Sequence, residues 1–352
     1  MNFASDNTSP VPPQVLDALR EANHGYAMPY GNDAIAAEVR DQIRTLFEAP
    51  EAEVFLVATG SAANALALAC ICPPWATVFC HRNAHIEEDE CGAPEFYTGG
   101  AKMTLVEGPD VKMTPGNLDA EIAFAARGGV HNVQRGAVSI TNVTEGGTVY
   151  SVDEVRALCA VARAYDLPVH MDGARFSNAL VATGASPADM TWRAGVDVLS
   201  FGGTKNGLMG VEAVVLFNPE KAWEFQLRRK RGGHLFSKHR YLSAQMQAYL
   251  TDDLWMKLAT RANASAARLS AGLLRVEGAE LIYPTDANMV FAKWPRAKHR
   301  AAMDGGAAYY MWPMDQSLDG PAEELISARL VCSWSTTDED VDQFLALLGV
   351  ET

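Results

Sequence analysis

A single lysine at the end of an apolar segment is the residue of this sequence best suited to chemistry. Residues 196–201 form an apolar run of strand length and are followed by Gly202, Gly203, Thr204 and Lys205. Lysine in glycine-rich surroundings can approach a ligand closely, and desolvation makes its ε-amine a neutral nucleophile. A lone loop lysine is more often simply solvated. The segment by itself is therefore weak evidence for a nucleophilic lysine, and a second functional group placed near Lys205 is needed to support that role.

A carboxylate ends a second strand-like segment further upstream. Residues 167–171 lead directly into Asp172. Ligands bind at the carboxyl ends of strands in open parallel sheets, so Asp172 and Lys205 can face one crevice. A lysine that forms a Schiff base and an aspartate that pairs with a pyridinium nitrogen are the two protein groups that pyridoxal phosphate requires. Asp172 alone could equally cap the following helix, but the pair favours the cofactor.

A third candidate feature is the turn at residues 59–61, between a predicted strand at 54–58 and a predicted helix at 62–72. The turn places backbone N–H groups at a helix N-terminus, where they suit a phosphate. It is too short for a Walker loop or a dinucleotide fingerprint. Gly60 and Ser61 are therefore candidate phosphate ligands, and an ordinary strand-to-helix turn is the alternative.

Arg329 lies within the otherwise apolar segment 326–331. A charge in such a strand is costly unless it is paired. Because the arginine fork matches a carboxylate, a ligand carboxylate is a natural partner. A structural salt bridge is the alternative.

Several ordered motifs resemble those of the low-specificity L-threonine aldolases, which are fold-type-I pyridoxal-phosphate enzymes close to the β-eliminating lyases. They include His-Met-Asp-Gly-Ala-Arg at 170–175, Ser-Phe-Gly-Gly-Thr-Lys-Asn at 200–206 and Phe-Ala-Ser-Asp-Asn at 3–7. The likeness runs over nearly the whole chain. It extends to Thr-Gly-Ser-Ala-Ala-Asn at 59–64, to the segment from Ala84 to Phe96 and to Arg-Leu-Val-Cys-Ser-Trp at 329–334.

The resemblance implies cleavage of the Cα–Cβ bond of L-threonine, L-allo-threonine and related L-β-hydroxy-α-amino acids such as phenylserine. The products would be glycine and an aldehyde. It implies that Lys205 holds pyridoxal phosphate and that Asp172 keeps its ring nitrogen protonated. It also implies that His85 stacks over the ring, that Gly60, Ser61 and Thr204 lie at the cofactor, and that Ser5, Tyr30, Arg175 and Arg329 contact the substrate, with Arg175 also near the cofactor.

The same resemblance implies a homotetramer built from dimers that share their sites. Lys238, together with Arg231 or Lys230, would reach the cofactor phosphate of a neighbouring subunit, with Tyr30 as a further contribution across the interface. The spacing of the basic run 228–231 differs from some family members, so the choice between Lys230 and Arg231 stays open.

The reaction also needs a base for the β-hydroxyl proton. His85 and His131 are candidates, because imidazole titrates near neutral pH and can act first as base and then as acid. His131 lies in the glycine-flanked segment 128–132, where a plain surface histidine is at least as well supported. A water molecule could replace either histidine.

Predicted strands alternate with helix-length segments from residue 53 onward, which indicates a largely parallel sheet covered on both faces. Ser151 and Glu154 are spaced as a capping box before a helix that ends near Tyr165. Only residues 207–212 separate the last strand of the sheet from the strand before it, so the last strand is expected to run antiparallel. The seven strands are expected at 54–58, 76–80, 102–106, 137–143, 167–171, 196–201 and 213–217.

The expected fold is therefore α/β, and the resemblance makes it fold-type-I transferase-like with a mostly parallel seven-stranded sheet. We expect an N-terminal arm at 1–14, a large cofactor-binding domain at 15–249 and a smaller C-terminal α+β domain at 250–352. In the last of these, strands are expected at 281–284, 289–294 and 328–334, and a helix at 338–348.

The composition of the chain limits the classes of partner that it is expected to bind. With 352 residues and a net charge of −14, the chain is a poor general partner for nucleic acid or an anionic membrane. Its six cysteines show neither a disulfide framework nor zinc-type spacing, and no metal is expected. No targeting segment or membrane span is expected, which favours the cytoplasm. An aminotransferase or β-eliminating lyase is the nearest rival function, and a non-catalytic protein of the same fold is a more distant one.

Overall fold

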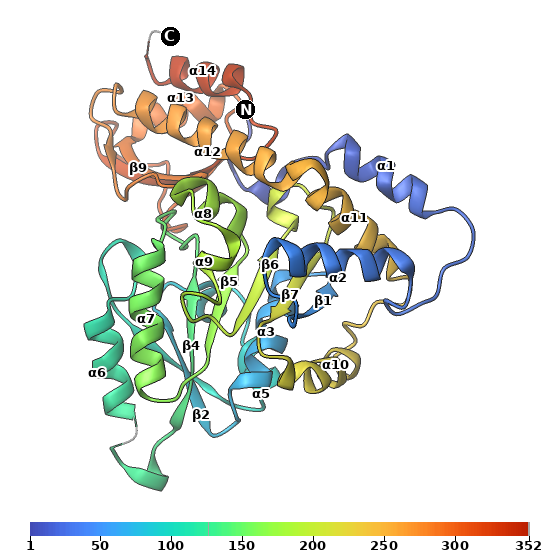
Figure 1. Ribbon diagram of the computed structural model, residues 1–352. Coiled ribbons are helices and arrows are strands. Elements are labelled where there is room, and N and C mark those ends of the chain that lie inside the picture. The colour runs from blue at the N-terminus through green and yellow to red at the C-terminus, as the bar shows by residue number, and fades with distance from the viewer. Residues whose placement is uncertain (126, 351–352) are drawn as a thin grey trace.

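The structure is a computed structural model that describes residues 1–125 and 127–350 (Figure 1). Its larger part is built on a seven-stranded sheet of order β1-β7-β6-β5-β4-β2-β3. Only the two pairings made by β7 are antiparallel, which confirms the predicted α/β class and the direction of the last strand. The strands are β1 (Glu53–Val57), β2 (Ala76–His81), β3 (Lys102–Val106), β4 (Gln134–Thr141), β5 (Val169–Gly173), β6 (Val198–Gly202) and β7 (Glu212–Leu216).

Both faces of this sheet are covered, because alternate strand residues enter different cores. Val54 and Leu56 pack in one cluster with α2, α6, α7 and α8, whereas Phe55 and Val57 pack in another with α3 and α10. Burial on both faces explains why the strands read as continuous apolar runs. The helices are α1 (Pro13–Ala22), α2 (Ala34–Leu46), α3 (Gly60–Ile71), α4 (His85–Glu88), α5 (Ala93–Thr98), α6 (Pro115–Ala125), α7 (Val152–Ala164), α8 (Phe176–Thr183), α9 (Pro187–Met190), α10 (Ala222–Arg231) and α11 (Arg240–Leu250).

A second, antiparallel sheet of order β10-β11-β9-β8 lies near the C-terminus. It is packed against α12, α13 and α14 (Figure 1). The short β10 was not predicted, and the predicted strand at 281–284 is only the two-residue β8. The elements are α12 (Leu254–Leu273), β8 (Glu280–Leu281), β9 (Met289–Pro295), α13 (Arg296–Asp304), β10 (Tyr310–Met311), β11 (Leu325–Val331) and α14 (Asp338–Leu347).

The N-terminal segment is part of this second core. Phe3 is fully buried there against Phe344. Its backbone N–H donates to the carbonyl of Ala308, and its carbonyl accepts from the N–H of Val331. The segment that follows Phe3 is therefore held at the junction of the two sheets.

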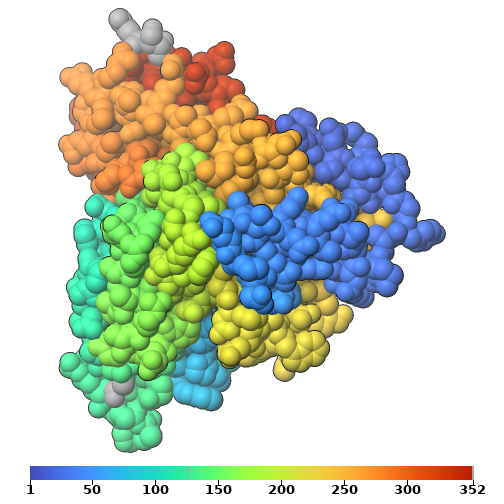
Figure 2. Space-filling model, viewed as in Figure 1, coloured from blue at the N-terminus to red at the C-terminus, as the bar shows by residue number. Residues whose placement is uncertain are grey.

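The loop between α1 and α2 extends away from the rest of the chain (Figure 2). It exposes large apolar side chains, including Tyr26 and Met28. None of the helices in the described part of the chain combines the length and the apolar character needed to cross a membrane.

Candidate active site

A cavity of about 350 Å³ lies at the carboxyl ends of β1, β5 and β6. This volume is in the range of small-molecule sites. Lys205 and Asp172 both line it, together with Gly60, Ser61 and His85. The two strand ends singled out in the sequence therefore open onto one cavity.

Asp172 lies near the end of β5 and is almost fully buried. Its Oδ1 accepts from the Ala174 N–H at 3.0 Å, and its Oδ2 accepts from Asn64 Nδ2 at 3.0 Å. It does not cap a helix, because α8 begins later and Arg175 occupies the N-cap position. Each carboxylate oxygen has a second lone pair, so Asp172 can also bind a protonated ring nitrogen.

Lys205 follows β6 in a short 3-10 turn. The two preceding glycines are required by packing: a Cβ on Gly202 would lie 2.2 Å from the carbonyl oxygen of Ala174, and one on Gly203 would lie 2.7 Å from that of Val211. The next residue, Asn206, is buried and donates to the Trp255 carbonyl at 2.8 Å. The lysine is thus held between two fixed points of the backbone.

His85 begins α4 and is oriented by a buried carboxylate. Its Nδ1 lies 2.9 Å from Glu90 Oε1, and Asn64 Nδ2 donates to the same oxygen at 2.8 Å. The hydrogen bond to Glu90 is the main cause that raises the pKa of His85, against the effect of burial. His85 and Asp172 are thereby linked through Glu90 and Asn64. The sequence interpretation missed both linking residues, although each lies in one of the quoted motifs.

The proposed phosphate ligands lie in the first turn of α3 rather than in a turn before it. Thr59 is the N-cap, and its Oγ1 accepts from the Ala62 N–H at 3.2 Å. The N–H groups of Gly60 and Ser61 have no partner within the helix, because the first turn of any helix leaves its donors free. Thr204 lines the same cavity. The N-terminus of α3 offers an anion both free backbone donors and the positive end of the helix dipole.

Arg329 lies in the middle of β11, opposite Phe291. Its Nη2 donates weakly to the Ala4 carbonyl at 3.4 Å, and its Nε is buried without a partner. The guanidinium lies over the rings of Tyr310 and Trp312, at 5.5 and 5.3 Å from their centroids. Burial lowers its pKa, and the nearby Arg175 lowers it further. Within residues 1–125 and 127–350 it forms no ion pair, so the structural salt bridge is not found.

Arg175 is already paired. Its Nε and Nη2 donate to the two oxygens of Asp6 at 2.6 and 3.0 Å, and both residues are buried. Burial opposes the ionisation of Asp6, but Arg175 and Lys205 outweigh it and lower the pKa of Asp6. The sequence interpretation missed Asp6, which is flanked by Ser5 and by Asn7, a residue of the cavity lining. The Ser5 hydroxyl accepts from the Asn7 N–H at 3.2 Å.

The structure does not bring the remaining candidates into this cavity. Ser5, Arg175 and Arg329 are not among the residues that line it, and neither are Tyr30, Arg231 and Lys238. Tyr30 instead lies under the ammonium of Lys230, at 4.8 Å.

His131 lies away from the cavity of its own chain. It is exposed just before the amino end of β4, whereas the cavity lies at the carboxyl ends of the strands. The eight residues of β4 span roughly 26 Å at about 3.3 Å per residue. His131 therefore cannot act on a substrate held at Lys205 of the same chain.

The residues that line the cavity fit pyridoxal phosphate. An amine, a buried carboxylate with free lone pairs and a helix N-terminus with free donors surround one space of suitable size. No group of three or more potential metal ligands is found among the described residues.

Comparisons with known proteins agree with this fit. A family model described as Beta-eliminating lyase matches residues 2–295. The low specificity L-threonine aldolase of Pseudomonas sp. (strain NCIMB 10558) is 40% identical over 98% of this chain and 96% of its own. That of Pseudomonas aeruginosa is 41% identical over 96% and 94%. The solved threonine aldolase of Leishmania major superposes with a TM-score of 0.90 at 26% identity, over 99% of this chain and 98% of that one.

Proposed function

The chain belongs to the Beta-eliminating lyase family, and we propose that it is a pyridoxal-phosphate-dependent aldolase of low specificity. It cleaves L-threonine, L-allo-threonine and related L-β-hydroxy-α-amino acids such as phenylserine to glycine and an aldehyde. The observation that carries the proposal is the shared cavity of Lys205 and Asp172.

Lys205 holds the cofactor covalently through its ε-amine, and Asp172 holds the proton on the ring nitrogen. When bound, pyridoxal phosphate supplies an electron sink for the bond that breaks at Cα. His85 covers one face of the ring and is kept in place by Glu90. Gly60, Ser61 and Thr204 bind the phosphate.

Arg329 binds the carboxylate of the amino acid. Its buried, unpaired Nε and its position over the rings of Tyr310 and Trp312 support this role, since a half-buried guanidinium without an anion is destabilised. Arg175 and Ser5 lie beside this position; because two N–H groups of Arg175 are bound to Asp6, it acts mainly by its charge. With the carboxylate bound by Arg329, the Cα–Cβ bond can be turned to align with the electron sink.

We further propose a homotetramer in which Tyr30, Lys238 and either Arg231 or Lys230 complete the cofactor site of a neighbouring subunit. Exposed large apolar side chains close in the chain to these residues support an interface, because apolar groups on a surface often mark sites of interaction. They include Tyr26, Met28, Trp223, Leu227 and Phe236. We also propose a cytoplasmic location, which suits six free cysteines, five of them buried.

Replacing the lysine tests the proposal. Lys205→Ala is expected to abolish both the visible absorbance of the bound cofactor and the release of glycine from L-threonine. The wild type should release glycine and an aldehyde from L-threonine, L-allo-threonine and phenylserine in the same assay. Turnover by Lys205→Ala would refute the assignment, and a 2-oxo acid as the main wild-type product would favour an aminotransferase or a β-eliminating lyase.

A further inference from the structure

A loop of the large sheet carries one further acidic side chain to this site. It begins at the carboxyl end of β4, where the Asn142 N–H donates to the Asp172 carbonyl at 2.9 Å. From residue 141 to residue 150 every residue is buried except Glu145, which is half-buried. A carboxylate is thus the only partly accessible side chain on a turn that starts beside Asp172.

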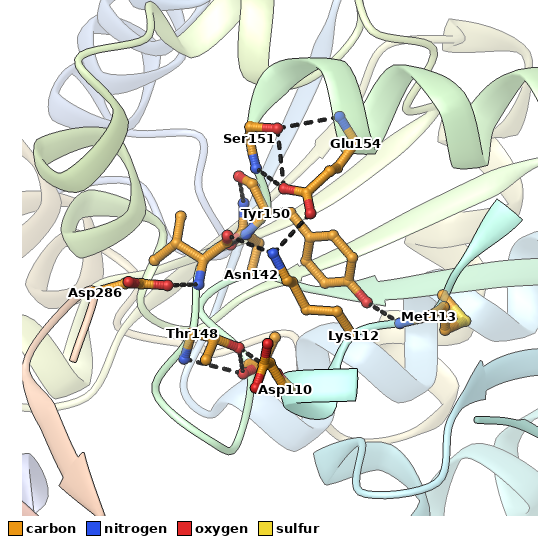
Figure 3. A network of polar contacts seen from close by, with 11 residues as sticks. Asp110, Lys112, Met113, Asn142, Thr148, Tyr150, Ser151, Glu154 and Asp286 are labelled. Carbon is orange, nitrogen blue, oxygen red and sulfur yellow. Dashed lines mark hydrogen bonds and ion pairs between the residues drawn. The ribbon is translucent and has the colours of Figure 1, made fainter. Parts of the chain in front are cut away.

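The turn is held on several sides (Figure 3). Thr148 Oγ1 lies 2.7 Å from Thr144 Oγ1 and donates to the Asp110 carbonyl at 2.5 Å. The Val149 N–H donates to Asp286 Oδ2 at 3.0 Å, which joins the turn to the segment before β9. This network fixes the backbone on both sides of Glu145.

Close packing restricts the turn further. A Cβ on Gly146 would lie 2.5 Å from Val111 Cγ2, and Gly147 has a φ of +82° against Met289. Val143 packs in the same cluster as Val331, which is two residues from Arg329 on β11. The turn therefore lies between the large sheet and the strand that carries the unpaired guanidinium.

The Glu145 carboxylate interacts electrostatically with groups on three different elements around the site. These are His85 and Glu88 on α4, Arg175 before α8 and Arg329 on β11. Within the described part of the chain Glu145 forms no hydrogen bond or ion pair. Glu145 is therefore a half-buried carboxylate on a restrained turn close to these side chains, and its own hydrogen-bonding capacity is unused.

We propose that Glu145 is a catalytic residue that accepts a hydrogen bond from the β-hydroxyl of the substrate and takes its proton as the Cα–Cβ bond breaks. This proposal rests on the proposed aldolase function. A carboxylate repels the substrate carboxylate, which Arg329 binds, and the substrate amine would be bound by the cofactor in place of the Lys205 amine. The β-hydroxyl is the remaining donor that Glu145 can bind.

The step balances without a further reactant. The O–H and Cα–Cβ bonds break, the carbonyl bond of the aldehyde forms, and the hydroxyl proton passes to Glu145. The electron pair of the Cα–Cβ bond stays with the glycine half and is used when Cα is protonated. Loss of the proton from Glu145 then restores its carboxylate.

Two variants and a matched control test the proposal in the holoenzyme. Glu145→Gln is expected to lower kcat for L-threonine by at least about 100-fold, with KM within about threefold. Glu145→Asp should restore part of this loss. Exchange of the glycine α-proton with D₂O should stay near the wild-type rate, because glycine has no β-hydroxyl. Asp110→Asn should retain wild-type kcat, because the exposed Asp110 side chain is outside the network and only its carbonyl contacts the turn.

A measurement that does not depend on turnover tests the position of Glu145. The charged groups that act on the His85 imidazole are Glu90, Asp172, Glu145 and Lys205, and Glu145 raises its pKa. An NMR titration of the His85 ring should therefore give a lower pKa in Glu145→Gln than in the wild type. Asp110→Asn should not change it.

Other outcomes overturn the proposal. An unchanged kcat in Glu145→Gln would exclude the proton transfer, and a lower KM with unchanged kcat would make Glu145 only a counter-ion of Arg329. Equal losses of threonine cleavage and glycine exchange would indicate a structural role, as would an unchanged His85 pKa. If the wild type itself releases no glycine from L-threonine, the proposed function fails, independently of Glu145.

Discussion

Replacing Arg329 with methionine should weaken substrate binding without weakening the fold. Methionine keeps much of the side-chain length between Tyr310 and Trp312 but removes the charge. The wild-type guanidinium has no ion pair among the described residues, its Nε is buried without a partner, and burial lowers its pKa. Folding therefore disfavours this charge, and the substrate carboxylate is expected to compensate for it.

The magnitude follows from the chemistry of a buried charge pair. Removing one partner of such a pair costs about 2 to 5 kcal/mol of binding free energy, and about 1.4 kcal/mol corresponds to a tenfold change. We therefore expect KM for L-threonine to rise by roughly 30-fold or more in Arg329→Met. The Kd of glycine should rise by a similar factor, because glycine carries the same carboxylate.

Thermal unfolding without any amino acid separates this effect from a structural one. The unfolding midpoint of Arg329→Met should be unchanged or higher than that of the wild type, because an unpaired, half-buried cation has been removed. Arg268→Met is the control: it removes an exposed arginine paired with Asp342 at 2.6 Å and should leave KM unchanged. A KM within twofold of the wild type, or a clearly lower midpoint in Arg329→Met, would refute the reasoning.

Two further predictions concern the buried pairs beside the cavity. Asp6→Asn should destabilise the protein by about 3 to 5 kcal/mol, because it leaves Arg175 buried without its counter-charge; denaturant unfolding should show this, with the exposed Asp17→Asn as a control close to the wild type. Since the pKa of Asp6 is lowered on folding, its contribution to stability should be present above the pKa of unfolded aspartate and lost as the pH falls through the lowered value. Glu90→Gln should lower the pKa of His85 in an NMR titration, because the hydrogen bond to Glu90 is the main cause that raises it. The contribution of protonated His85 to the free energy of unfolding should accordingly be lost in the wild type as the pH rises through that raised pKa. This loss should be smaller in Glu90→Gln.

Local sequence patterns predicted the large sheet well. The strands are buried on both faces, so each appears as a short apolar run, and Ser151 and Glu154 form the predicted capping box. Placing Lys205 and Asp172 at one cavity required only the rule that parallel strands end at the same edge. These features depend on residues close together in the chain or on the topology of the whole sheet.

Contacts between distant residues could not be predicted in the same way. Asp6 and Arg175 are 169 positions apart, and Asn64 and Asp172 are 108 apart. Nothing in the sequence around Asp6 indicates that its partner is an arginine rather than the substrate. The position of His131 is of another kind, because the predicted strand at 137–143 already placed this residue at the amino end of the strand, away from the cavity of the same chain.

The two halves of the site come from different parts of the fold, and this affects how far the family comparison supports each. Lys205, Asp172 and the start of α3 lie on the large sheet, inside the residues that the family model matches. Arg329 lies on β11, beyond residue 295 where that match ends. The cofactor is therefore supported by both the family and the cavity, whereas the role of Arg329 depends on its own unpaired, buried charge. A substitution at Arg329 is for this reason a sharper test of substrate recognition than any substitution at Lys205, which reports on the cofactor alone.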